Sequence, residues 1–513
     1  MSAVAENNRR IARNTLMLYI RMFLTMAIGL YTSRVVLRVL GVEDCGIYGV
    51  VGGIVPMFAF INSSMAASTQ RFLTFEIGKG NGGRVKDVFN STILIHALIA
   101  VVVFVIAETA GLWFLETKMV IPEARMDAAR WVYQFTVFYS VVSIMCVPYN
   151  ALIIAYERMS VFAYISVTEA VLKLLVLYLV LAFDADRLVV YALLMLLLQL
   201  AILFTYLSYS KRSFKDARLE LYFDRQLLRQ MAFFAGWSLY GNIAFVMFTQ
   251  GLNILLNVFF GAVVNAARGF AVQVQSAVQM FVGGFQTALN PQIVKYYAEG
   301  NLEQMHELIF SSSRFSFYLL YILSLPVILE TEMLLTLWLV DVPPYTVVFV
   351  QIMLCIMLVD SMANPLITAA NATGKIKRYQ KVIGGLLLLI LPLSYAVLRF
   401  GGEPWMVFIV HLLVAVVAQT VRLFIIRPMI RLSIREYSTK VMLGITKVLF
   451  LSLPLPLAMK MLMPAGLGTS IAVIAVSVLL AVVVVLLFGL GKGEKEFVLS
   501  KIRIKRGKDD KCQ

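Results

Sequence analysis

The sequence predicts an all-α polytopic membrane protein with about 14 transmembrane helices, and three observations carry this prediction. Of the 513 residues, 60% are hydrophobic and 14% are charged, against about 25% charged residues in soluble domains. The apolar residues form continuous runs of roughly 20 residues, which as helices would cross about 30 Å of hydrocarbon. Basic residues gather between the runs. Because the runs are continuous, a membrane β-barrel with alternating strands is excluded.

Charged and Gly/Pro-containing turns divide the apolar runs into six spans in each half of the chain and two at its end. The first six spans form an expected N-terminal lobe at 1–210, and a polar connector at 211–230 leads to a C-terminal lobe at 231–430. Two more spans within 431–490 precede a basic tail at 491–513. The expected spans are 14–38, 46–69, 89–113, 131–154, 161–182, 188–208, 232–259, 264–290, 315–338, 345–370, 382–398, 405–426, 441–463 and 469–490.

The distribution of positive charge predicts which side each loop occupies, because Lys and Arg collect on cytoplasmic loops. The segments assigned to the cytoplasm contain 32 of the 45 Lys and Arg residues, and those assigned outside contain five. We therefore expect a multi-pass protein with both termini in the cytoplasm. The net charge of +16 follows from this topology and from contact with lipid head groups, so it does not indicate a nucleic-acid partner.

An internal repeat relates the two halves of the chain. Duplicated units with an even number of spans share one orientation, so the lobes should be related by an axis along the membrane normal, with the substrate path between them. The matched pairs are Gly41 with Gly261, Gly80 with Gly300 and Gln70 with Asn290, all 220 residues apart, and Asn150 with Asn364, 214 apart.

Polar side chains lie on one face of the expected eighth span. Arg268, Gln275, Gln279 and Gln286 are separated by 7, 4 and 7 residues, which confines them to a stripe about 40° wide on a helix. Exposing such a stripe to lipid costs free energy, so it indicates that this face lines a hydrated cavity. The alternative is that the glutamines join neighbouring helices by hydrogen bonds.

Two other spans carry similar stripes. Gln250, Asn253 and Asn257 share a face of the seventh span, and Asp360 and Asn364 share a face of the tenth. These residues either line the same cavity or bond helices together. Asp360 is a candidate for coupling transport to H⁺ or Na⁺, or it pairs with an arginine.

Arginine at mid-depth suggests the charge of the substrate. Arg21 lies near the middle of the first span and has no acidic neighbour in sequence. Guanidinium groups bind phosphate oxygens bidentately and stay charged when desolvated. Arg21 and Arg268 are therefore the residues that we expect to hold an anion. By contrast, Glu169 and Lys173, an i, i+4 pair on the fifth span, should neutralise each other.

The sequence contains no recognisable catalytic or cofactor motif. It lacks a phosphate-binding loop, an H-E-x-x-H motif and a His/Cys cluster with metal-ligand spacing. We expect no enzyme activity, no cofactor and no metal site.

The segment from Ser33 to Tyr48, with the L-G-x-x-x-x-G-x-Y pattern of Leu40 to Tyr48, resembles the turn between the first two helices of a transporter family. This family comprises the polysaccharide-type flippases of the multidrug/oligosaccharidyl-lipid/polysaccharide exporter superfamily, and the fourteen-helix plan is similar over nearly the whole chain.

The resemblance implies a bacterial inner-membrane protein that moves undecaprenyl-pyrophosphate-linked oligosaccharide repeat units to the outer leaflet for O-antigen, capsule or exopolysaccharide. It also implies a cationic cavity between the lobes, with Arg21 and Arg268 on the matching helices, and alternating access. Other polysaccharide-assembly proteins would be partners. Two alternatives stay open: a multidrug or cation antiporter of the same superfamily, and a membrane glycan polymerase or ligase.

Overall fold

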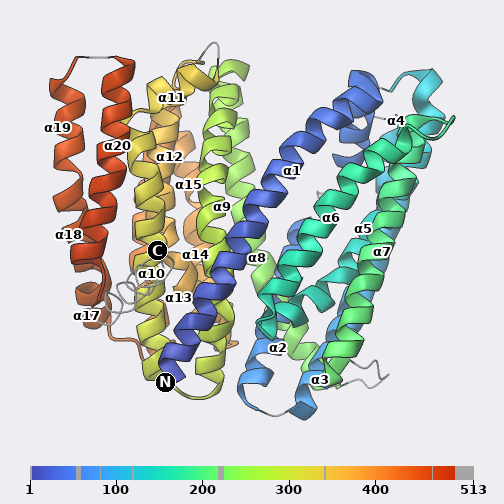
Figure 1. Cartoon of the computed structure of the whole chain (residues 1–513), viewed down its shortest axis with the longest axis horizontal. Coiled ribbons are helices and arrows are strands. Elements are labelled where there is room, and N and C mark those ends of the chain that lie inside the picture. The colour runs from blue at the N-terminus through green and yellow to red at the C-terminus, as the bar shows by residue number, and fades with distance from the viewer. Residues whose placement is uncertain are drawn as a thin grey trace, which may run out of the picture. The chain divides into compact units, whose positions relative to one another are not determined.

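The computed structural model describes residues 3–53, 59–80, 82–117, 121–217, 224–339, 342–464 and 466–491, and every regular element in these ranges is a helix (Figure 1). Eleven helices in this part of the chain are long and apolar enough to cross a membrane. The structure therefore confirms the all-α polytopic class. The expected spans 14–38, 46–69 and 264–290 are not among the eleven, and residues 54–58 of the second lie outside the described residues. The third of these lies in a helix whose polar stripe lowers its mean hydropathy.

The helices form two compact units. The first unit comprises Met1–Ile243, Thr287–Asn301 and Asn371–Lys381, so it takes two short segments from the second half of the chain. Its helices are α1 (Ala3–Gly53), α2 (Ala59–Gly78), α3 (Gly82–Ile106), α4 (Leu112–Thr117), α5 (Met126–Ala155), α6 (Met159–Val180), α7 (Arg187–Ser213) and the beginning of α8 (Arg225–Phe260).

The second unit comprises Ala244–Gln286, Leu302–Ala370 and Val382–Gln513. It contains most of the second half of the chain, whereas the division into lobes at 1–210 and 231–430 stays a prediction. Its helices are the rest of α8, most of α9 (Ala262–Ala298), α10 (Leu302–Leu329), α11 (Thr331–Trp338), α12 (Thr346–Ser361), most of α13 (Ala363–Ala372) and of α14 (Lys377–Leu388), α15 (Ile390–Arg399), α16 (Met406–Ile430), α17 (Ile434–Tyr437), α18 (Leu443–Ser452), α19 (Pro454–Leu462) and α20 (Leu467–Val484).

Matched glycines of the repeat adopt matching backbone conformations. Gly41 interrupts α1 with a φ of 82°, and Gly261, between α8 and α9, has a φ of 79°. Gly80 and Gly300, which follow α2 and α9, have φ values of 71° and 75°. Positive φ favours glycine because a Cβ atom is strained there. The 220-residue spacing therefore relates pairs of turns with the same backbone geometry.

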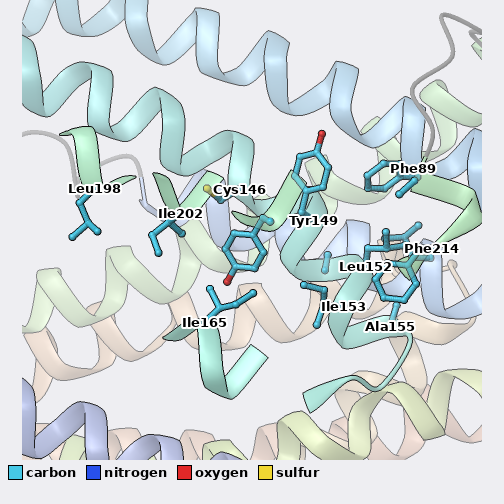
Figure 2. Packing of buried hydrophobic residues seen from close by; sticks show 14 of the residues in the cluster. Phe89, Cys146, Tyr149, Leu152, Ile153, Ala155, Ile165, Leu198, Ile202 and Phe214 are labelled. Carbon is cyan, nitrogen blue, oxygen red and sulfur yellow. The ribbon is translucent and has the colours of Figure 1, made fainter. Parts of the chain in front are cut away.

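Aromatic and aliphatic side chains form the core of the first unit (Figure 2). The rings of Phe89 on α3 and Tyr149 on α5 meet edge to face with centroids 5.4 Å apart. Tyr156 and Phe214 stack at 4.6 Å. Leu152 of α5 is fully buried among them. This packing holds the end of α5 in place, and one of the polar clusters described below begins there.

The C-terminal helices attach to α10 through buried polar contacts. The fully buried carboxylate of Glu330, directly after α10, accepts hydrogen bonds from Lys460 Nζ at 2.8 Å and Ser470 Oγ at 2.7 Å. Tyr321 and Ser452 hydroxyls lie 2.9 Å apart. In Figure 1, α20 lies beside α10, and α18 and α19 lie next to α20. The predicted basic tail, apart from its first residue, lies outside the described residues.

Candidate substrate and ion site

Arg268 joins the polar faces of α8 and α9 within the second unit. Its Nη2 donates to the carbonyl oxygen of Thr249 at 3.0 Å, and its Nη1 donates to Asn253 Oδ1. Asn253 Nδ2 in turn donates to Gln250 Oε1 at 2.9 Å. The structure thus brings together three of the residues that the seventh and eighth spans were expected to present, because only Gly261 separates α8 from α9 and the Arg268 side chain reaches Thr249 and Asn253 on α8.

The charge of Arg268 is compensated poorly by its neighbours. The residue is 9% exposed, and within the described chain no carboxylate forms a salt bridge with it. Its Nε is buried and has no hydrogen-bond partner among the described residues. A buried cation with neutral partners is costly. An anionic ligand would supply both the missing acceptor and the missing negative charge.

The other residues of the two stripes differ in their surroundings. Gln286 is buried and donates to Ser316 Oγ and to the carbonyl oxygen of Ser361, both at 3.3 Å, so it joins α9 to α10 and α12. Gln275 is half-buried, whereas Gln279 and Asn257 are exposed. The helix-joining alternative therefore describes the contacts of Gln286, and the exposed pair remains available to solvent or ligand.

Arg21 lies in the first unit, on α1. Its guanidinium carbon is 4.7 Å from the centroid of the Phe162 ring on α6, a cation–π distance. As in Arg268, the Nε atom is buried and has no hydrogen-bond partner in the described part of the chain. Each of the two expected anion-binding arginines therefore has a buried Nε–H without a described acceptor, and the two residues belong to different compact units.

Asp360 and Asn364 flank a break between α12 and α13. The first helix ends at Ser361 and the second begins at Ala363. The Asp360 side chain is exposed and lies within the electrostatic influence of Arg422 on α16. Asn364 Oδ1 is a buried acceptor without a hydrogen-bond partner among the described residues, and so is Oδ1 of Asn150, its match in the repeat. Oxygen atoms beside a broken helix are suitable ligands for a proton or Na⁺.

A hollow of about 440 Å³ lies between α1 and α6 in the first unit. The Glu169 carboxylate and the Lys173 ammonium group, which line it, lie 2.6 Å apart. This contact confirms the expected ion pair. Because the two charges neutralise each other, this hollow offers no net charge to a substrate.

A buried polar cluster at the ends of α5 and α9 was not anticipated from the sequence. The Glu157 carboxylate accepts hydrogen bonds from Lys295 Nζ and Gln292 Nε2, and the carbonyl oxygen of Glu157 accepts one from Asn14 Nδ2 at 3.5 Å. The side chains of Glu157 and Lys295 are 3% and 16% exposed. All four residues belong to the first unit. We name them the Glu157 cluster.

Arg71, in the second half of α2, makes a related contact. Its Nε and Nη2 donate to the carbonyl oxygens of Asn371 and Ala372 at 3.0 and 2.8 Å. These carbonyls end α13, so the cation also faces the negative end of a helix dipole. At the repeat offsets Arg71 corresponds to Pro291, next to Gln292, and Glu157 corresponds to Asn371, so the two contacts occupy neighbouring and not identical positions of the repeat.

The ends of α2 and α9 also meet directly. A Cβ added at Gly78 would lie 2.9 Å from the Ala298 Cβ and 3.0 Å from the Lys295 Cα. Gly78 and Ala298 are 220 residues apart, so they are equivalent positions of the repeat. Sequence spacing could have suggested the pair but not that the two residues touch.

No protein-family model matches this sequence, and no curated protein matches it. Solved structures do share its architecture: a multidrug resistance MATE family transporter of the MOP superfamily, in an outward-facing conformation, superimposes with a TM-score of 0.71 and 12% sequence identity, over 83% of this chain and 96% of the other. The chain has the fold of MATE transporters.

Two further solved structures support the same assignment of fold. The Vibrio cholerae MATE transporter VcmN, in its bent form, gives a TM-score of 0.67 at 15% identity over 86% of this chain and 100% of that one. A MOP superfamily transporter from Pyrococcus furiosus gives 0.67 at 13% identity, over 83% and 96%. Reversed polarity of its binding pocket suggests a different function for that transporter. At these identities the likeness establishes the fold and not the substrate.

Proposed function

We propose that this chain is a membrane transporter, not an enzyme, and that it carries a lipid with an anionic head group. The candidate substrate is undecaprenyl-pyrophosphate-linked oligosaccharide, moved across the bacterial inner membrane by alternating access, with both termini in the cytoplasm. The pyrophosphate and sugars would enter a hydrated cavity while the polyprenyl tail stays in lipid. Polysaccharide-assembly proteins would be its partners.

One observation carries the proposal of an anionic substrate. Arg268 is a buried cation that donates to a neutral amide and to a backbone carbonyl, and its Nε has no hydrogen-bond partner among the described residues. The same holds for the Nε of Arg21. A pyrophosphate oxygen would satisfy such a donor with a charge-assisted hydrogen bond. The exposed amides of Gln250, Asn257 and Gln279 would suit sugar hydroxyls.

Asp360 and Asn364 supply the proposed coupling site. A carboxylate beside a buried amide oxygen can take up H⁺ or Na⁺ and change its net charge on doing so. In an alternating-access cycle, the Glu157 cluster and the Arg71 contact join helix ends from both halves of the sequence, so these contacts would break and form again in each cycle.

A second candidate is a multidrug or cation antiporter. The MATE fold and the exposed carboxylate of Asp360 favour it, because a carboxylate attracts cationic substrates. The distinction between the candidates rests on which charge the substrate carries.

The test is transport by the full chain in proteoliposomes, offered either a labelled polyprenyl-pyrophosphate saccharide or the cation ethidium. We expect transport of the lipid-linked saccharide. Arg268→Ala should reduce it by about tenfold or more, since losing a buried charged anchor costs about 2 to 5 kcal/mol, and Arg268→Lys should recover part of it. The matched control is Arg378→Ala, which removes an exposed arginine at the start of α14.

Transport of ethidium without movement of the saccharide would refute the proposal and establish the second candidate. A chain that lengthens the lipid-linked saccharide would instead be a polymerase or ligase. In cells, deletion of the gene should leave single lipid-linked repeat units facing the cytoplasm.

A further inference from the structure

A hollow lined by arginines lies where α16 ends. It measures about 800 Å³, and its lining includes Phe424 and Arg427 of α16, Arg431 and Ser433 of the following turn, and Ile434 and Arg435 of α17. All of these residues belong to the second compact unit. The positive-charge distribution predicts that this end of α16 faces the cytoplasm.

The turn after α16 directs three arginines into one hollow. Arg431 takes a left-handed conformation, with φ 56° and ψ 37°, and the amide of Leu432 donates to the carbonyl oxygen of Arg427 at 3.1 Å. Ile430 and Leu432 are buried on either side of Arg431. The buried neighbours fix the conformation of the turn, so Arg427, Arg431 and Arg435 line the same hollow in the structure as it stands.

Nothing in the described chain neutralises this group. Arg427, Arg431 and Arg435 are exposed, and none of them forms a salt bridge with a described carboxylate. The acidic neighbour in sequence, Glu436, does not line the hollow. One cation can interact with the negative end of the α16 dipole, but three cations exceed that need. A multivalent anion is the ligand chemistry that compensates them.

The position of the hollow along α16 indicates where the anion comes from. Along α16, exposed apolar side chains form a stripe that includes Leu413, 61% exposed, and Phe424, 60% exposed, and the helix is long and apolar enough to span a membrane. Phe424 belongs to both the stripe and the hollow. Arg427 follows it by three residues, or about 4.5 Å of helix rise. The arginines therefore lie where lipid-facing surface gives way to the head-group layer.

We propose that this hollow binds the phosphate head group of an anionic membrane phospholipid, whose acyl chains lie along the apolar stripe of α16. Guanidinium groups hold phosphate oxygens bidentately, and basic pockets on the cytoplasmic side of transmembrane helices are suited to such head groups. The bound lipid would stabilise the turn between α16 and α17. This site is separate from the substrate residues of the proposed function and does not depend on them.

The experiment is native mass spectrometry of the purified full-length protein, titrated with phosphatidylglycerol or phosphatidylcholine. The test variant carries Arg427→Gln, Arg431→Asn and Arg435→Gln. Asn is chosen at 431 because it tolerates the left-handed conformation. The control variant removes the same charge from exposed cations at the end of α7 and just after it, with Lys211→Gln, Arg212→Gln and Lys215→Gln.

Wild-type protein and the control should retain phosphatidylglycerol with similar affinity, and the test variant should bind it at least tenfold more weakly. Phosphatidylglycerol should also raise the Tm of wild-type protein and leave that of the test variant unchanged. The single variant Arg435→Gln, outside the strained turn, should give an intermediate loss even if the triple variant folds poorly.

Several outcomes would overturn the proposal. If phosphatidylcholine binds as tightly as phosphatidylglycerol, the lipid charge does not determine binding. If the control variant loses as much phosphatidylglycerol affinity as the test variant, the loss comes from the overall surface charge and not from this hollow. Displacement of phosphatidylglycerol by millimolar inorganic phosphate would assign the hollow to a soluble anion. Binding of undecaprenyl pyrophosphate without phosphatidylglycerol would assign it to a lipid-linked substrate.

Discussion

Replacing Lys295 with methionine tests whether the Glu157 cluster stabilises the first unit. Methionine preserves most of the length of the side chain and removes its charge. The Glu157 carboxylate, 3% exposed, would then keep the Gln292 amide and lose the ammonium group of Lys295. Removing one partner of a buried ion pair costs about 3 to 5 kcal/mol, because it leaves an uncompensated charge.

This cost converts into a measurable shift of Tm. Unfolding entropy of about 2.1 cal/mol/K per residue gives about 1.1 kcal/mol/K for a cooperative chain of 513 residues. Lys295→Met should therefore lower the Tm of the detergent-purified protein by about 3 to 5 °C, measured by scanning fluorimetry. Adding Glu157→Gln should recover at least half of that loss, since the buried charge is then absent.

The control is Lys440→Met, which breaks a pair of the same chemistry at an exposed position. Lys440 and Glu307 are 44% and 58% exposed, and such pairs contribute about 0 to 1 kcal/mol. The control should lower the Tm by less than about 1 °C. Equal shifts for the two methionine variants, or no shift for Lys295→Met, would refute the reasoning that burial makes the Glu157 cluster stabilising.

Two further predictions follow from contacts in the first unit. Gly78→Ala would place a Cβ 2.9 Å from that of Ala298. It should lower the free energy of unfolding by about 1 to 3 kcal/mol and lower the Tm. The control Gly236→Ala, where a Cβ would meet open space, should leave the Tm unchanged. Burial opposes ionisation of Asp186, but hydrogen bonds from Arg125 and from backbone amides hold the pKa of Asp186 below its usual 3.8. The charged form thus stabilises the fold above pH 3.8, so the Tm advantage of wild-type protein over Asp186→Asn should be present at neutral pH and disappear as the pH falls below 3.8. An advantage that is the same at pH 3 and pH 7 would contradict this assignment.

The residues of the expected cavity show how far pattern analysis reaches. Helical periodicity placed Arg268 and Asn253 on polar faces, and the structure joins them because the two helices are consecutive and connected by one tight turn. The same periodicity placed Gln286 on the face of Arg268, yet its partners, Ser316 and Ser361, come from α10 and α12. The spacing of residues along one helix does not determine which neighbouring helix packs against a given turn of that helix.

The Glu157 cluster was beyond sequence reasoning for a related reason. Glu157 lies in a short connection between two expected spans, where a charged residue needs no explanation. Its ammonium partner is 138 residues away in the sequence. The 220-residue repeat relates the turns, but the carboxylate and the lysine do not recur at matching positions, so symmetry alone does not identify them.

Composition and periodicity determined that this chain is a membrane-embedded helical protein, because the cost of exposing polar backbone to hydrocarbon leaves few solutions for long apolar runs. Tertiary structure decided which charges are paired and which are left over. Glu169 is neutralised by a neighbour four residues away, which local spacing predicts. Arg268 Nε has no hydrogen-bond partner among the described residues, and Glu157 pairs with a lysine 138 residues away, because burial and pairing depend on which helices pack together.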